Sequence, residues 1–242
     1  MTEAKSMPLL RLLKPAAHAE KQLLAAIMNG DYPIGSTLLG ERELAQQLGV
    51  TRPTLREALQ RLARDGWLDI QQGKPTRVRD YWQESNLAVM AAVSQPSHPR
   101  SADFIRAVLE ERAMLAPSYV RQAMERAPDS MAELLSTYAD LPDEAQAFAE
   151  ADWNLHKHIA GLSANSIFPL VLNGFSGLAL TVGARYFARP NYREQSRVFY
   201  RGLLHLAQAP DPRSEANLAE AEALTRRVMQ TAVVQWCEFG PL

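Results

Sequence analysis

The sequence predicts a mostly α-helical protein in which an N-terminal winged helix-turn-helix precedes a larger all-α helical bundle. Two short amphipathic segments meet at Gly49, and a pair of β-type segments follows directly after Gly66. Beyond Ser101 the apolar residues recur at helical spacing, and no strand pattern competes with it. At 242 residues the chain is long enough for two domains, each with its own core.

The first helix is expected to run from Pro15 to about Met28. Its apolar residues Leu23 and Ile27 lie on one face, and Gly30 has the character of a C-cap. A proline in the first helical position is harmless, because the N–H group it lacks would have no partner inside the helix. The sequence therefore predicts a short amphipathic helix ahead of the helix-turn-helix.

The helix-turn-helix itself is predicted after the turn-rich stretch at residues 31–40. A short helix at residues 41–48 ends at Gly49, and a third helix extends from the N-cap Thr51 to about Asp65. In such a motif the second helix of the pair enters the major groove of DNA with its N-terminal residues. This chain is therefore expected to bind double-stranded DNA.

A β-hairpin wing is predicted immediately after the third helix. Trp67, Leu68 and Ile70 indicate one strand, residues 72–75 a turn, and residues 76–78 a returning strand. Two helices and a hairpin in this order distinguish a winged helix-turn-helix from an ordinary pair of amphipathic helices with a solvated face.

Three regions follow from this pattern. Residues 1–80 form the DNA-binding domain, residues 81–100 a linker ending in the loop-type sequence SQPSHPR, and residues 101–242 a helical domain for effector binding and dimer association. The helices of the last region are expected at about 101–125, 129–140, 143–162, 165–188, 191–208 and 213–237.

Charge and composition agree with an intracellular regulator. Residues 1–80 carry a net charge of +3 and residues 81–242 one of −4, which suits a DNA-binding N-terminus. Cys237 is the only cysteine, so a disulfide framework and a Cys-rich zinc site are excluded, and the cytoplasm is the expected location. The uncharged stretch at 159–184 is interrupted by glycines and polar residues, which favours a buried helix over a membrane span.

The residues at the start of the third helix carry the chemistry of DNA recognition. Arg52 and Arg56 can each donate two hydrogen bonds to the O6 and N7 atoms of guanine, while Thr54 can contact phosphate or a thymine methyl group. Arg42, one helix earlier, is placed to reach the same groove or its phosphates.

The segment ERELAQQLGVTRPTLREALQRLARDGWLDIQQGKPTRV (41–78) resembles the N-terminal domain of the GntR family of bacterial regulators. The similarity is closest to the fatty-acid-responsive members and is nearly ungapped. It implies a homodimer on a pseudo-palindromic operator, with the third helix in the major groove and the wing tip in the minor groove. The positions that match operator contacts or their polar neighbours are Arg42, Thr51, Arg52, Thr54, Arg56, Gln72, Gly73 and Lys74.

Two residues depart from the fatty-acid-responsive pattern. Pro53 stands where those members have a threonine, and Gln72 stands where they have the histidine of the wing. Glutamine can still bond minor-groove acceptors. DNA binding is therefore expected to survive these changes more easily than an identical operator preference.

The resemblance continues, more weakly, through the helical domain, for example in AFAEADWNLHKHIAGLSAN (147–165) and TRRVMQTAVVQW (225–236). It implies that long-chain fatty acyl-CoA binds there as an effector and releases the operator. The matching ligand positions are Arg112, Tyr186, Arg226 and Trp236. Arginines can pair with coenzyme A phosphates, and the aromatic rings offer amphipathic walls.

Each of these ligand positions also has a purely structural interpretation. Trp236 fits the core of a terminal helix, and Arg226 can pair with Glu222, four residues earlier on the same face. Met229 and Ala232 stand where the fatty-acid-responsive members have glycine and serine. The identity of the effector therefore stays open at this point.

A metal site is the alternative that Asp152 and His156 raise, because their spacing places both on one helical face. Related GntR regulators bind a metal through such a pair and two later histidines, but Arg201 and Gln230 occupy the matching positions here. Two ligands are too few for a stable Zn²⁺ or Ni²⁺ site, so a hydrogen-bonded pair in the core is favoured and no metal is expected. A bound metal would favour a carboxylate metabolite as effector.

The sequence thus predicts a regulator of fatty acid metabolism, repressing or activating, which needs no cofactor beyond the acyl-CoA effector and no membrane. An enzyme or carrier with an added DNA-binding module is disfavoured, because no catalytic arrangement can be placed. A purely architectural DNA-binding dimer without a ligand remains a third hypothesis.

Overall fold

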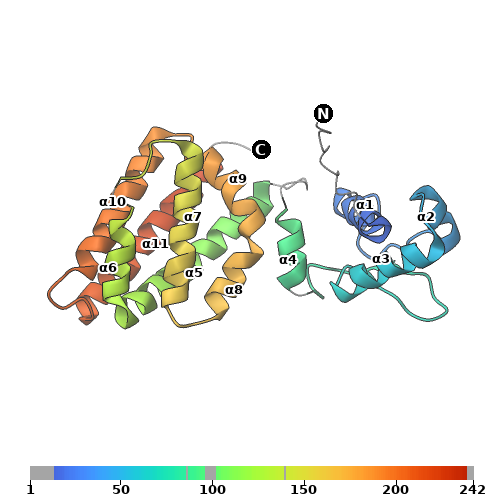
Figure 1. Ribbon diagram of the computed structural model, residues 1–242, viewed down its shortest axis with the longest axis horizontal. Coiled ribbons are helices and arrows are strands. Elements are labelled where there is room, and N and C mark those ends of the chain that lie inside the picture. Colours follow the sequence, from blue (N-terminus) through green and yellow to red (C-terminus); the bar gives the residue numbers. More distant parts are fainter. Residues whose placement is uncertain (1–13, 86, 96–101, 139, 239–242) are drawn as a thin grey trace, which may run out of the picture. The chain divides into compact units, whose positions relative to one another are not determined.

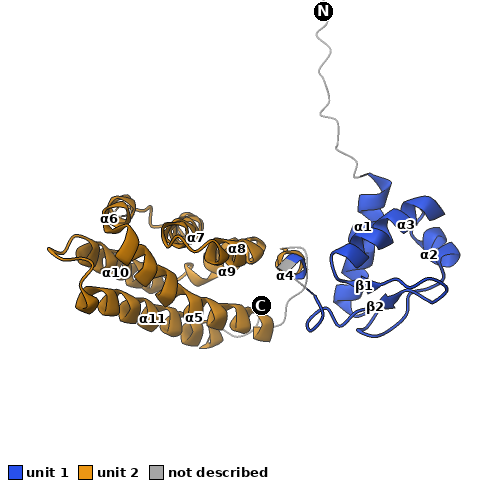
Figure 2. Cartoon of the chain, turned by 90° about the horizontal axis from the view of Figure 1, so that it is seen from below, with its two compact units in different colours: residues 1–89 blue, residues 90–242 orange. Residues whose placement is uncertain are grey.

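The computed structural model describes residues 14–85, 87–95, 102–138 and 140–238. The chain forms two compact units, residues 1–89 and residues 90–242 (Figure 2). Nearly all of its regular structure is helical, and one two-stranded antiparallel sheet accompanies the helices of the first unit. The predicted fold class, a winged helix-turn-helix followed by a helical bundle, is confirmed.

The first unit is built on three helices, α1 (Pro15–Asn29), α2 (Glu41–Gln47) and α3 (Arg52–Arg64) (Figure 1). Helix α1 ends at Gly30, which has a φ of 86°, a left-handed conformation that costs glycine little. Both α1 and α2 pack on α3. Their apolar faces form the core of the unit, with Leu23, Ile27, Leu44, Leu55, Leu59 and Leu62 almost fully buried.

The wing consists of β1 (Leu68–Asp69) and β2 (Arg77–Val78), with Leu68 opposite Val78. Both strands are shorter than the sequence pattern predicts: the ladder pairs only Leu68 with Val78 and Asp69 with Arg77, and the exposed Ile70 lies outside it. The stretch at 31–40 is more than a turn. Its Thr37 forms an antiparallel bridge with Arg77, so this stretch supports the wing from the other side.

The second unit is a bundle in which α5 and α11 pack along their length. Its helices are α5 (Ala102–Arg126), α6 (Pro128–Ser136), α7 (Ala145–Leu162), α8 (Ile167–Gly174), α9 (Ser176–Tyr186), α10 (Pro190–Ala207) and α11 (Glu215–Glu238). Large side chains such as Tyr119, Phe148 and Phe199 fill the core between them.

The expectation of one helix at 165–188 is wrong. Helices α8 and α9 meet at Phe175 with a bend of 69°. A Cβ atom added at Gly174 would lie 3.0 Å from the Met90 sulfur, so the corner is packed too closely for any larger residue without a shift. Among the described residues no single helix is long and apolar enough to cross a membrane, and only this bent pair passes that test when taken together.

Helix α4 (Leu87–Val93) lies inside the segment that the sequence predicts as a linker. The boundary between the two compact units falls within this helix, between Val89 and Met90. Its C-terminal end is fitted closely against the α8–α9 corner. A Cβ atom at Gly177 would come within 2.5 Å of the Ser94 carbonyl oxygen. The backbone directly after α4 therefore touches α9 at a position that only glycine allows.

Candidate DNA interface and effector site

The start of α3 presents the residues predicted to recognise DNA. Thr51 caps the helix, with its hydroxyl oxygen accepting a hydrogen bond of 3.3 Å from the Thr54 backbone N–H group. The two threonine hydroxyls also bond one another at 2.8 Å. Arg52 and Arg56 extend from this end of the helix with about three fifths of their side chains exposed. The first turn of α3 is thus capped by a side chain, and its arginines are accessible.

The two arginines share one carboxylate. Glu41, the first residue of α2, accepts a hydrogen bond of 2.8 Å from Arg56 Nε, and the same oxygen lies 3.7 Å from Arg52 Nη2. Sequence analysis did not single out Glu41. Its partners lie 11 and 15 positions away on another helix, so the spacing along one helix could not show the contact.

The wing tip lies in the exposed turn between the strands. Gly73 has a φ of 76°, and its neighbours Gln72 and Lys74 are exposed. Lys74 Nζ donates a hydrogen bond of 2.7 Å to the Gln71 side chain, which holds the tip in shape. The turn, together with Arg56, lines an open cleft between the wing and helices α2 and α3. Arg42 is exposed on α2.

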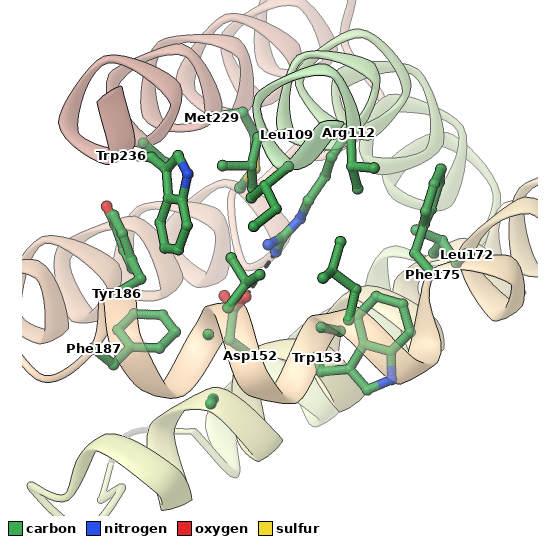
Figure 3. Close-up of a pocket in the computed structure, with 18 of the residues that line it drawn as sticks. Leu109, Arg112, Asp152, Trp153, Leu172, Phe175, Tyr186, Phe187, Met229 and Trp236 are labelled. Atoms are coloured by element: carbon green, nitrogen blue, oxygen red, sulfur yellow. Dashed lines mark hydrogen bonds and ion pairs between the residues drawn. The ribbon is translucent and has the colours of Figure 1, made fainter. Parts of the chain in front are cut away.

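An apolar cavity of about 90 Å³ lies inside the second unit. Five of the helices that surround it, α5, α7, α8, α9 and α11, supply most of the wall, and Figure 3 shows ten of the lining residues by name. Trp236 and Tyr186 stand on one side of it, and Leu172 and Phe175 on the other. The wall is thus mainly hydrophobic and aromatic, with Ser196 and one ion pair as polar groups, which is typical of ligand pockets.

That ion pair joins Arg112 of α5 to Asp152 of α7, with 2.7 Å between Nη2 and Oδ2 (Figure 3). The other carboxylate oxygen accepts a hydrogen bond of 2.9 Å from the Tyr200 hydroxyl group. His156 lies behind the carboxylate, 3.6 Å away, and bonds the Tyr119 hydroxyl at 2.7 Å. The charges are buried but paired, as buried charges must be.

Burial governs the protonation of this cluster. Desolvation, together with the nearby Arg112 charge, lowers the pKa of His156 to about 3, so the imidazole is neutral at neutral pH. Burial opposes ionisation of Asp152, but the attraction of Arg112, the field of His156 and the hydrogen bonds from Arg112 and Tyr200 together outweigh it and hold the pKa of that carboxyl below its usual value. One positive and one negative charge therefore coexist beside an apolar cavity.

The structure brings three of the four predicted ligand positions together. Arg112, Tyr186 and Trp236 line the cavity, whereas Arg226 lies outside its lining and pairs with Glu222 at 2.7 Å. The positions of the two departures in α11, Met229 and Ala232, are also part of the wall. Sequence analysis missed Tyr119, Trp153 and Tyr200 because helical spacing shows which residues face the core but not which of them meet.

Asp152 and His156 are adjacent, as their spacing predicts, but the carboxylate of Asp152 is paired with Arg112. In the ranges that the structure describes, no group of three or more His, Cys, Asp and Glu side chains is arranged to hold a metal ion. Arg201, at one of the positions where metal-binding relatives have histidine, pairs with Glu194 on the same helix. The positive charge beside Asp152 is therefore the guanidinium group of Arg112.

Comparison with known proteins assigns both units. Residues 15–78 match the family model described as bacterial regulatory proteins, gntR family, and residues 79–239 match the FadR C-terminal domain. The fatty acid metabolism regulator protein of Erwinia tasmaniensis is 40% identical over 192 residues, which cover 79% of this chain and 81% of that protein. The protein of the same name from Salmonella paratyphi B is 41% identical over 194 residues, covering 80% and 81%.

A solved structure supports the same fold. The structure of Lar, whose title concerns control of the Listeria monocytogenes agr system, has a TM-score of 0.58 at 15% identity and covers 99% of this chain and 100% of that one. The family models and the names of the relatives confirm the expectation of a DNA-binding regulator rather than an enzyme. The chain belongs to the GntR family of bacterial regulatory proteins and carries a FadR-type C-terminal domain.

Proposed function

We propose that this chain regulates the transcription of fatty acid metabolism genes, binding a pseudo-palindromic operator as a homodimer in the cytoplasm and leaving it when long-chain acyl-CoA binds. The observation that carries the proposal is the apolar cavity inside a FadR-type domain. Relatives at 40–41% identity are named fatty acid metabolism regulator proteins, which supports the same biological role.

The size of the cavity bears on the mechanism. Its volume of about 90 Å³ is smaller than the roughly 150 Å³ of a cavity that binds benzene. A long acyl chain therefore cannot enter without displacing the surrounding helices. This requirement couples binding to a change of shape, because the ligand favours a state in which those helices stand further apart.

Arg112 is proposed to meet the acyl end of the ligand rather than the coenzyme A phosphates. The side chain is buried and already paired with Asp152, and its Nε atom meets no hydrogen-bond partner among the described residues. That N–H group suits the thioester carbonyl, the one polar group adjoining the chain. Arg226 is exposed and could exchange Glu222 for a phosphate, so the two arginines take separate roles.

The ligand proposal predicts a thermal shift and the loss of operator binding. Oleoyl-CoA at 100 times its Kd should stabilise the domain by about 2.7 kcal/mol, because it binds only the folded state. Differential scanning calorimetry measures the shift, and fluorescence anisotropy on a FadR-type operator measures release. Coenzyme A alone and acetyl-CoA are the controls. Operator binding that stays constant at saturating oleoyl-CoA would contradict the proposal.

The contact between α4 and α9 is proposed to transmit the change of shape. Helix α9 lines the cavity with Leu178 and Val182, while its Gly177 touches the backbone of Ser94, directly after α4. Gly177→Ala is expected to displace α4 and to weaken operator binding without ligand about tenfold, a typical allosteric coupling. Anisotropy on the same operator measures this effect.

Gly161→Ala on α7 is the matched control, because a Cβ atom there meets nothing within 4 Å. Both variants should bind oleoyl-CoA. An operator affinity of Gly177→Ala equal to that of the Gly161→Ala control would mean that the contact plays no part in transmission.

A further inference from the structure

The carboxylate of Glu41 is the feature of the DNA interface that the proposed function does not use. One of its oxygens accepts a hydrogen bond of 2.8 Å from Arg56 Nε and lies 3.7 Å from Arg52 Nη2. The two arginines stand four residues apart on α3, on the same helical face. Their exposed fractions are 58% and 61%, while Glu41 is only 35% exposed. The acid therefore lies beneath two basic side chains that point toward solvent.

The contact with Glu41 uses only the Nε atom of Arg56, so the two terminal Nη groups can still contact a base. Glu41 bonds the Nε–H group, and the guanidinium meets no other partner among the described residues. Both terminal Nη groups can therefore donate to the O6 and N7 atoms of one guanine. An arginine held in this way loses less rotamer freedom when it binds a base than a freely rotating one does.

The negative charge of Glu41 lowers the affinity for DNA of any sequence. Affinity for arbitrary duplexes comes mainly from cations that neutralise phosphates. A carboxylate beside two such cations cancels part of their attraction for the backbone. This cost applies to every duplex, whereas the benefit of oriented arginines is gained only where the bases match.

We propose that Glu41 is a positioning residue for sequence discrimination: it orients Arg56 and Arg52 toward base edges and lowers affinity for non-cognate DNA. The inference deepens the proposed operator binding and rests on it. Glu41 thus contributes to the sequence selectivity of α3 through the two arginines, without having to touch DNA itself.

The test compares Glu41→Gln with wild type on two duplexes. The first duplex is selected by the wild-type protein from a randomised library, and the second is a scrambled sequence of the same composition. Because the selected duplex is defined by the protein itself, the test does not depend on a FadR-type operator or on acyl-CoA. Fluorescence anisotropy at several salt concentrations gives both affinities.

Glu43→Gln is the matched control. It makes the same change of net charge two positions along α2, and Glu43 forms no ion pair with a described residue. Both variants should bind the scrambled duplex as tightly as wild type or tighter. Only Glu41→Gln should lower the ratio of selected to scrambled affinity, by about tenfold, within the discrimination that one bidentate contact supplies.

Two results would overturn the inference. In the first, Glu41→Gln keeps the wild-type affinity ratio. In the second, it weakens binding to both duplexes by the same factor, which would indicate a purely structural role for the ion pair. A double-mutant cycle with Arg56→Ala adds an independent measure, because the two effects on the ratio should be non-additive if Glu41 acts through that arginine.

Discussion

Replacement of Arg112 by alanine is expected to destabilise the helical domain by about 3–5 kcal/mol, the usual effect of removing one partner of a buried ion pair. Without Arg112, burial opposes ionisation of Asp152, so folding must either bury an unpaired carboxylate or protonate it, and among the described residues the Tyr200 hydroxyl is the donor that stays bonded to it. Urea unfolding followed by circular dichroism, compared with wild type, measures the loss. A change below about 1 kcal/mol would mean that water or a rearranged side chain compensates the carboxylate.

Two further variants separate the buried charge from lost packing. Arg106→Ala removes an exposed partner of Glu110 on the same helix and should lower the free energy of unfolding by at most about 0.5 kcal/mol. Adding Asp152→Asn to Arg112→Ala removes the unpaired charge and should restore part of the stability. If the double variant is no more stable than Arg112→Ala, the loss comes from packing rather than from electrostatics.

Arg52→Ala is expected to weaken specific operator binding by about 1–3 kcal/mol, roughly 5- to 150-fold, because it removes a side chain placed to bond a guanine edge. Binding to a scrambled duplex should weaken much less, since only one phosphate-neutralising charge is lost. Competition binding with both duplexes gives the two values. Unchanged operator affinity would contradict the role assigned to this arginine.

Arg64→Ala provides the control for this experiment. Arg64 lies in the last turn of the same helix, is 73% exposed and pairs with Asp65. Its replacement removes the same charge from the far end of α3. A loss of affinity in Arg64→Ala equal to that in Arg52→Ala would indicate a general electrostatic effect instead of base recognition.

The N-terminal unit was predictable almost residue by residue because its determinants are local. Thr51 caps α3, and Gly30 ends α1 in the left-handed conformation, as each residue type favours. The wing was predicted in kind but not in length. Its second strand also pairs with Thr37, which reaches Arg77 from 40 positions earlier, and such long-range contacts leave no periodic signal.

The cavity proposed to bind the effector was predictable only in part. The resemblance to GntR regulators placed Arg112, Tyr186 and Trp236 in one site, and the structure brings all three to one cavity. Arg226 was assigned to the same ligand, yet it lies outside the cavity lining beside Glu222. Helical periodicity shows which face of a helix is buried, but it does not show how far along the bundle two buried residues meet.

The sequence by itself determined the fold class and the family resemblance, and it predicted the residues of α3 that are proposed to contact DNA. Apolar periodicity, caps and motif spacing are all encoded over a few turns of chain. Only the tertiary structure decided the bend between α8 and α9, the pairing of Arg112 with Asp152 and the contact of Glu41 with two arginines. Each of these depends on close approach between separate elements, and packing in three dimensions, not local propensity, sets those distances.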